Sequence, residues 1–285
     1  MGGFKLMRNK VHLIICSCII ISIAIVISIR GGLAIKKYSG IRRLCDAIAI
    51  NDTKEALDII PKIDDVNSFT SPIILNNIFR LLDHQVQCPL VEACKAGNYE
   101  IAKELLLQGA DPNQCLQGYW GPMEATFLNP NEDRLAIAQL LIEHGAEVNL
   151  HGSGDSALFN ELQNMAYRTD SSIQKDIYHA SILLLLDHGA DPVDENGNTV
   201  MHYICYSGDM VLLQQLSVTH SSQLDAKNAN GQTPLMWAAE GECEEVIEYL
   251  LYIGVDATAT DTEGKTAYDY AVQSDNNDII ALLGN

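Results

Sequence analysis

One stretch of the sequence comes near a cofactor-binding motif, HGSGDSA at residues 151–157. It contains G-x-G-x-x-A, the spacing of a glycine-rich turn that holds dinucleotide phosphates at the start of a helix. Such a turn works between the strand and the helix of a βαβ unit, and no βαβ pattern surrounds this stretch. The same residues fit the loop and helix start of a unit in an internal repeat. We therefore expect no nucleotide cofactor.

The other residues that could do chemistry do not form a constellation. The sequence lacks H-E-x-x-H, G-x-S-x-G and P-loop motifs, and its eight cysteines include no C-x-x-C and no zinc-ligand spacing. His144 and His188 each follow an apolar helical pattern, where a cationic ring suits the helix dipole. Adjacent acids such as Glu244 and Glu245 are typical of a solvent-exposed helix face. We expect no catalytic residue, no cofactor and no metal, and hence no enzyme activity.

The elements that would position these residues form an internal repeat. Its period shows in two sets of residues spaced by 34 and 33 positions, Gly197, Gly231 and Gly264 and Thr199, Thr233 and Thr266. Each unit begins with a tight turn at Thr and a short apolar helix, as in TPLMWAA, where Pro suits the first turn. A second helix has apolar residues at i, i+3 and i+4, as in VIEYLL, and ends at Gly. Neither helix can bury its apolar face alone, so the units must stack.

The segments NGQTPLMWAAEG, HGADPN and EHGAEVN resemble the ankyrin repeat, whose T-P-L-H-x-A-A, G and L-L-x-x-G-A-D-x-N elements occur here in the same order. The resemblance covers residues 44–285. It implies an all-α repeat solenoid, in which helix–turn–helix units are joined by hairpin fingers. It also implies that His202, in TVMHYI, makes hydrogen bonds in the loop and does not bind metal.

About seven units fit the domain at residues 44–285. The first lacks the opening T-P and the last stops after its second helix, so both are expected to act as caps. Two insertions interrupt the spacing, near residues 68–87 and 166–177, and extra residues inside a solenoid have to project from it. They either recognise a specific partner or have no role.

The chain begins with a basic segment at residues 1–10 and an uncharged apolar run at residues 11–29. As a helix the run is roughly 28 Å long, close to the ~30 Å hydrocarbon core of a bilayer. It is expected to be a transmembrane helix or an export signal, joined to the repeats by a basic linker at residues 30–43. We favour an uncleaved anchor over cleavage, because no A-x-A site comes directly after the run. Either Met1 or Met7 fits as the start residue.

The charge distribution bears on orientation and on partners. Residues 1–43 hold eight basic and no acidic side chains, so the other 242 residues carry 10 basic and 37 acidic ones, a net charge of −27. A positive-inside count places the domain in the cytoplasm, whereas an anchor at the extreme N-terminus usually exports the domain behind it. These arguments conflict, and we favour a periplasmic domain. An acidic body repels phosphate backbones, so we expect no nucleic acid as a ligand. The charge either attracts a basic protein surface, the partner we favour, or serves only to keep the domain soluble.

Binding is the function that remains, on the concave face formed by hairpin fingers and first helices. Aromatic residues are enriched among binding hot spots, and acidic fingers would steer a basic partner. The candidate contacts are Tyr119, Trp120, Asp155, Tyr167, Arg168, Asp194, Glu195, Asn230, Asp261 and Glu263. Trp237 is expected in the core, and no small-molecule ligand is expected.

Two functions fit this organisation. A basic leader, an apolar segment and an ankyrin domain together resemble bacterial envelope ankyrin proteins, among them immunity proteins paired with phospholipase effectors of type VI secretion systems. That resemblance implies a membrane-tethered module that binds and inhibits one protein partner, such as a toxin or lipase effector. The alternative is an envelope scaffold or maintenance protein that supports another enzyme without inhibiting it.

Overall fold

The computed structural model describes residues 39–68, 88–114, 120–128, 133–150, 156–167 and 172–284. The expected apolar segment at residues 11–29 and nearly all of the insertion near residues 68–87 lie outside these ranges. Within them the chain is helical with connecting loops and has no β-strand, only an isolated bridge between Val193 and Thr199. None of the helices in the described ranges is long and apolar enough to cross a membrane. The chain divides into two compact units, residues 1–111 and 112–285.

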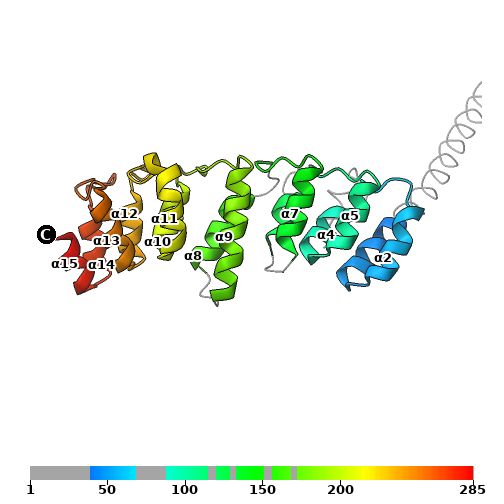
Figure 1. The fold of residues 1–285 in the computed structure, drawn as a ribbon, viewed down its shortest axis with the longest axis horizontal. Coiled ribbons are helices and arrows are strands. Elements are labelled where there is room, and N and C mark those ends of the chain that lie inside the picture. Colours follow the sequence, from blue (N-terminus) through cyan, green and yellow to red (C-terminus); the bar gives the residue numbers. More distant parts are fainter. Residues whose placement is uncertain are drawn as a thin grey trace, which may run out of the picture. The chain divides into compact units, whose positions relative to one another are not determined.

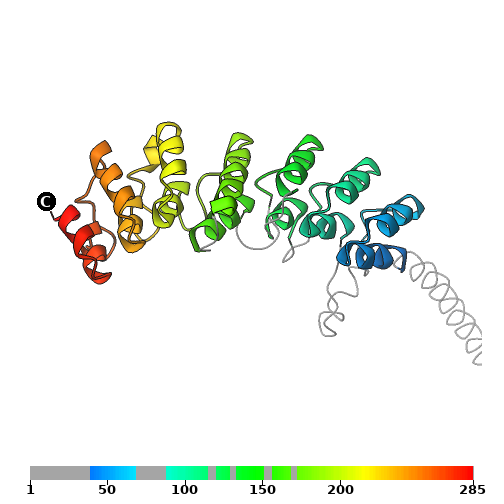
Figure 2. The same ribbon diagram turned by 60° about the horizontal axis from the view of Figure 1, so that its bottom comes forward.

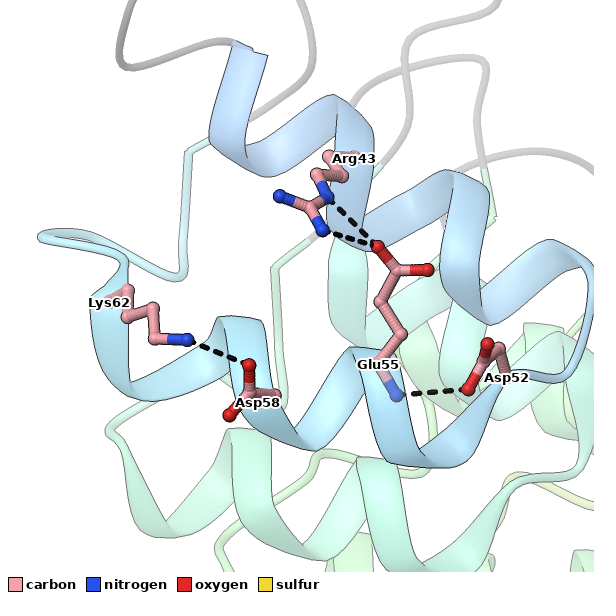
Figure 3. Close-up of polar contacts among 5 residues, drawn as sticks. All are labelled: Arg43, Asp52, Glu55, Asp58 and Lys62. Carbon is pink, nitrogen blue, oxygen red and sulfur yellow. Dashed lines mark hydrogen bonds and ion pairs between the residues drawn. The ribbon is translucent and has the colours of Figure 1, made fainter.

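The first unit contains two helix pairs among its described residues. A helix over residues 39–49 precedes α2 (Thr53–Ile59), which continues into the 3-10 turn η1 (Ile60–Lys62), and α4 (Pro89–Ala96) packs against α5 (Tyr99–Leu107). Arg43 on the first helix donates from Nε and Nη2 to Glu55 on α2, at 2.9 and 2.7 Å (Figure 3). Asp52 caps α2 by accepting from the Glu55 N–H at 2.9 Å.

The second unit contains five helix pairs among its described residues. They are α6 (Pro122–Thr126) with α7 (Arg134–Glu143), α8 (Ala157–Tyr167) with α9 (Ser172–Asp187), α10 (Val200–Ser207) with α11 (Met210–Thr219), α12 (Pro234–Glu240) with α13 (Glu244–Ile253), and α14 (Ala267–Gln273) with α15 (Asn277–Leu283). A 3-10 turn, η4 (Ser221–Gln223), follows α11. First helices pack against one another from α6 to α14, and the second helices α11, α13 and α15 do the same (Figures 1 and 2).

The expected insertion near residues 166–177 contributes to helices where it is described. Residues 166–167 are the last of α8, and residues 172–177 are the first of α9. With 16 residues, α9 is longer than the other second helices of this unit, which have 7 to 10. The extra turns lengthen the α8–α9 pair at the end opposite the fingers.

The periodic apolar residues form the core, as α13 illustrates. Val246, Ile247 and Leu250 are fully buried, whereas Glu245 and Glu248 on the opposite face are exposed. Burying an aliphatic side chain of this size contributes about 1.5–3 kcal/mol. A ten-residue helix in isolation is marginal in water, so this burial against neighbouring helices is what stabilises α13.

Neighbouring fingers are tied together by an asparagine. Asn149 donates from Nδ2 to the Gly189 carbonyl at 2.9 Å and accepts from the Asp191 N–H at 2.8 Å. Asn113 makes the same two bonds one repeat earlier. In the next repeat Val193 holds this place, and the repeat after it ends in η4 instead of at a glycine. The asparagine and the glycine it contacts are therefore lost together.

The helix starts follow the expected residues, with one difference. The hydroxyls of Thr233 and Thr266 accept from the backbone N–H three residues later, at 3.4 Å. Thr199 makes no such cap, because its N–H and its hydroxyl contact His202 Nδ1 at 3.1 and 3.0 Å. His202 Nε2 lies 3.0 Å from the Gln232 carbonyl in the next finger, to which it donates. The hydrogen-bonding role that the ankyrin resemblance implies for His202 is confirmed.

Candidate protein-interaction surface

Aromatic side chains from three first helices form a continuous series of ring contacts, here called the aromatic ladder: Phe159, Tyr203, Trp237, Tyr206 and Tyr167. The successive centroid distances along this series are 5.6, 5.2, 6.0 and 5.4 Å, and the rings are tilted or edge-on. Such pairs contribute about 0.5–1.5 kcal/mol beyond the area they bury. The ladder therefore holds α8, α10 and α12 together.

One end of the ladder is buried, and the other end is exposed to solvent. Phe159 and Tyr203 are buried, Trp237 and Tyr206 are half-buried, and Tyr167 is 60% exposed. The expectation that Trp237 lies in the core is thus only partly right, since its side chain is half-buried. Tyr167, which was expected to contact a partner, is the exposed end of a packed aromatic series.

Repeat register explains why Tyr203 and Trp237 meet. Tyr203, Trp237 and Tyr270 each lie four residues after the Thr that starts their unit, and Tyr206 and Glu240 each lie seven residues after it. On a helix, residues at these two spacings lie close to the same face. Packing of the first helices side by side turns each position into a row that crosses α10, α12 and α14.

Polar contacts fix the half-buried part of the ladder. The indole Nε1–H of Trp237 donates to Gln232 Oε1 at 3.3 Å, and Gln232 Nε2 donates to the Tyr270 hydroxyl at 2.8 Å. Gln232 belongs to the finger before α12, so it joins that finger to the first helices of two repeats. A partner meets these rings already ordered, which lowers the entropy cost of binding.

The two predicted finger aspartates have structural roles. Asp194 Oδ1 accepts from the N–H groups two and four residues later, both at 2.8 Å, and its Oδ2 accepts from the Tyr203 hydroxyl at 3.1 Å. Asp261 makes the equivalent bonds at 2.8 and 2.9 Å, with Tyr270 at 2.8 Å. Partial desolvation acts to raise the pKa of Asp261, but these hydrogen bonds outweigh it, so the pKa is lowered. Both carboxylates shape their fingers and connect them to tyrosines of the first helices.

The other predicted residues of the fingers lie at exposed tips. Glu195 and Asn230 are exposed, and the Asn230 carbonyl accepts from the Thr262 N–H of the next finger at 2.9 Å. Glu263 is exposed but pairs with Lys265 at 2.7 Å, which offsets its charge locally. Glu195 therefore presents an accessible negative charge to a partner, and Asn230 presents its side-chain amide.

Of the four remaining predicted contacts, the structure describes Trp120. It lies two residues before α6 and is 42% exposed, so its side chain is accessible to a partner. Tyr119, Asp155 and Arg168 lie outside the described residues. Of the predicted contact residues, Tyr167 belongs to the aromatic ladder, where its ring packs against that of Tyr206.

Sequence reasoning missed Tyr206 and Glu240 and assigned Trp237 to the core. The signal that could have found them is the row they form when the repeats are aligned on Thr199 and Thr233. Aromatic residues at the fourth position of three consecutive first helices, Tyr203, Trp237 and Tyr270, indicate an aromatic row better than any single residue does.

The ladder lies in a strongly acidic part of the chain. Residues 156–285, which contain every ring of the ladder, hold 20 acidic and four basic side chains. Lys227 contacts the Thr260 carbonyl at 2.8 Å and Lys265 pairs with Glu263, whereas Lys175 is exposed. Burial and the nearby negative charge, including that of Glu240, raise the pKa of Tyr167. This part of the chain therefore combines neutral tyrosine hydroxyls with an excess of carboxylates over basic side chains.

The cysteines of the described residues have the properties of core side chains. Cys94 and Cys205 are fully buried. Burial raises the pKa of Cys88 and of Cys243 to about 11 and also raises that of Cys205, so these thiols stay protonated near neutral pH. Across the ranges that the structure describes, no group of three His, Cys, Asp or Glu residues could hold a metal ion.

Stacked helix pairs, hairpin fingers and the Thr–His contact define the class of protein. Ankyrin repeat models match residues 87–115 as a single repeat, and residues 172–261 and 212–285 as arrays of three copies. The chain belongs to the ankyrin repeat family. Ankyrin repeats are protein-interaction modules, so the face that carries the ladder is a candidate binding surface.

Solved structures of the same fold include the ankyrin repeat domains of human ASB11 and of Bcl-3, an IκB family member. The first has a TM-score of 0.56 and 23% identity, covering 70% of this chain and 83% of that one. The second has a TM-score of 0.58 and 16% identity, covering 85% and 98%. At these identities the likeness shows the fold alone.

Curated relatives are much longer proteins. The chain is 25% identical over 210 residues to protein glp-1 of Caenorhabditis elegans, covering 68% of this chain and 15% of that protein. It is 24% identical over 199 residues to the phosphocholine transferase AnkX of Legionella pneumophila, covering 65% and 20%. It is 30% identical over 189 residues to a probable palmitoyltransferase AKR2 of Saccharomyces uvarum, covering 64% and 24%. The chain thus spans at most about a quarter of the length of these relatives.

Proposed function

We propose that this chain is a membrane-tethered ankyrin module that binds one basic protein partner and inhibits it, with no catalytic activity of its own. The observation that carries the proposal is the aromatic ladder, which is packed at Phe159 and Tyr203 and open to solvent at Tyr167. Rigid aromatic side chains that are half-buried before binding are typical anchors of protein interfaces.

Charge supports a basic partner. The 20 acidic side chains of residues 156–285, against four basic ones, attract a cationic surface at long range. Such steering raises the association rate and makes it depend on salt, because charges are screened beyond about 8 Å at physiological ionic strength. An inhibitor gains from this arrangement, since it has to capture its target before the target acts.

The apolar run at residues 11–29, with basic flanks and no acid in residues 1–43, supports the tether. In this proposal the run stays attached as an anchor and holds the ankyrin domain on the periplasmic side of a bacterial membrane. The partner is then a toxin or lipase effector that acts at the same membrane. Digestion of the domain by protease in spheroplasts, and its protection in intact cells, tests the orientation.

The test of function is co-expression of the full-length chain with the product of the neighbouring gene. A complex of the two proteins, together with survival of cells that otherwise die from the partner, supports the inhibitory role. A stable complex with several housekeeping proteins and no protection from any toxin would overturn it in favour of an envelope scaffold.

A further inference from the structure

The open end of the aromatic ladder has the geometry of a cation-binding subsite. Tyr167 and Tyr206 come from the ends of α8 and α10, and their ring centroids lie 5.4 Å apart with planes inclined at 56°. At this distance the two rings are in contact, and the notch on the side where their planes diverge is here called the wedge. Because Tyr167 is 60% exposed, a side chain from a partner can lie against its accessible face at this notch without displacing the core.

A carboxylate stands beside the wedge. Glu240 holds the same repeat position on α12 that Tyr206 holds on α10, and its side chain is exposed. Because α10 and α12 pack side by side, this shared position places Glu240 next to the row that contains Tyr206, and its negative charge contributes to the raised pKa of Tyr167. Of the three lysines that follow α8, Lys227 contacts the Thr260 carbonyl and Lys265 pairs with Glu263, whereas Lys175 at the start of α9 is exposed.

We propose that the wedge formed by Tyr167 and Tyr206, with Glu240 beside it, binds an arginine side chain of the protein partner. A guanidinium is planar and weakly hydrated, so it stacks on an aromatic face while its N–H groups form a two-bond contact with a carboxylate. An ammonium of lysine is a compact, strongly hydrated charge and uses only part of this geometry.

Charge complementarity selects this occupant over an apolar side chain. An apolar group in the wedge would leave Glu240 desolvated beside it without a partner, which is unfavourable. An arginine satisfies the carboxylate and covers both rings. The inference rests on the proposed function, because it names the residue type by which the basic partner is anchored at the same surface.

The test uses the full-length chain in a non-ionic detergent and three fluorescent peptides of equal length, in which glycine alternates with arginine, with lysine or with citrulline. Citrulline has the shape of arginine without its charge, and lysine has the charge without the planar group. Fluorescence anisotropy at about 0.15 M salt gives the three dissociation constants, under conditions that screen distant charges.

Four single variants locate the site. Tyr167→Ala and Glu240→Gln remove one wall and the carboxylate of the subsite. Tyr252→Ala and Glu248→Gln are their matched controls on α13, since Tyr252 is 87% exposed and Glu248 is an exposed acid with the same charge change. We expect the arginine peptide to bind about fivefold more tightly than the lysine peptide and to lose about fivefold in either subsite variant but in neither control.

Equal binding of the arginine and lysine peptides, or equal losses in the subsite variants and the controls, would overturn the arginine subsite and leave only diffuse attraction to an acidic surface. Absence of binding of all three peptides would overturn it as well. The proposed function fails by a different result, in which the wild-type chain co-expressed with the product of the neighbouring gene neither forms a complex with it nor protects cells from it. The two failures are therefore distinguishable.

Discussion

Arg134, the first residue of α7, and Glu161 in the middle of α8 form an ion pair in the interior of the second unit. Their Nη2 and Oε2 atoms are 3.1 Å apart, and Nη1 donates to Oε1 at 3.3 Å. The side chains are 1% and 0% exposed, and the guanidinium lies 4.8 Å from the centre of the Tyr178 ring on α9. Burial lowers the pKa of Arg134, while the Glu161 carboxylate opposes this shift. The pair joins two repeats through charges that are withdrawn from water.

Replacing Glu161 with Gln should destabilise the protein strongly. The variant leaves the Arg134 guanidinium buried without a counter-charge, a change that typically costs about 3–5 kcal/mol. Urea unfolding followed by circular dichroism measures the difference in the free energy of unfolding. The matched control is Glu55→Gln, which breaks the exposed Arg43–Glu55 pair of Figure 3 and should cost at most about 1 kcal/mol.

Replacing both partners, as Arg134→Met with Glu161→Leu, should recover most of that loss, because two apolar side chains of similar size carry no desolvation cost. If the double variant were as unstable as Glu161→Gln, the cost would come from altered packing and not from an unpaired charge.

Replacing a fingertip glycine with alanine should cost more stability at Gly231 than at Gly264. Gly231 and Gly264 have φ of 75° and 81°, so alanine is strained by about 1–2 kcal/mol at either position. At Gly231 a Cβ would also lie 2.9 Å from the Thr262 nitrogen in the next finger, whereas nothing lies within 4 Å at Gly264. Thermal unfolding should therefore show Gly231→Ala to be less stable than Gly264→Ala. Equal losses would mean that the fingers do not approach each other this closely.

Stability should fall as the pH drops below about 6.5, and His202 should contribute to this fall. Burial lowers the pKa of His202 from its ordinary value of 6.5, against the opposing effects of the Gln232 carbonyl and Asp194. The unfolded chain therefore binds a proton at a higher pH than the folded one. The contribution of His202 is complete above pH 6.5 and is lost as the pH falls toward its lowered folded value.

Urea unfolding at pH 7.5 and 5.5 tests this linkage. His202→Gln should reduce the difference in stability between the two pH values, because glutamine does not titrate. His188→Gln changes an exposed histidine and should leave the difference as it is in the wild type. An unchanged pH dependence in His202→Gln would show that other groups cause the effect.

The sequence predicts the fold well because the repeat imposes it. Thr199, Thr233 and Thr266 set a register in which each unit supplies the apolar surface that its neighbour needs. The same register contains the row of Tyr203, Trp237 and Tyr270, but a single unit cannot show that these rings meet. Their contacts depend on how neighbouring first helices pack.

Other features depend on contacts that no spacing reveals. Asp194 and Asp261 are predicted to steer a partner, and the structure adds that each accepts backbone and tyrosine hydrogen bonds in its finger region. Arg134 and Glu161 are 27 residues apart and meet only because α7 and α8 place them at the same depth of the core. The signal of such a pair is a charged residue at a core position of the repeat. Glu161 holds the position that Ala238 holds in a later repeat.

The most direct test of a partner-binding ladder is the affinity of the full-length chain for the product of its neighbouring gene, measured by isothermal titration calorimetry for the wild type, Tyr167→Ala and Tyr252→Ala. Both tyrosines are exposed, so neither substitution should unfold the protein. We predict that Tyr167→Ala weakens binding by about tenfold or more, as expected of an aromatic hot spot, and that Tyr252→Ala leaves it unchanged. Wild-type affinity in Tyr167→Ala, or an equal loss in both variants, would contradict a partner-binding role for the aromatic ladder.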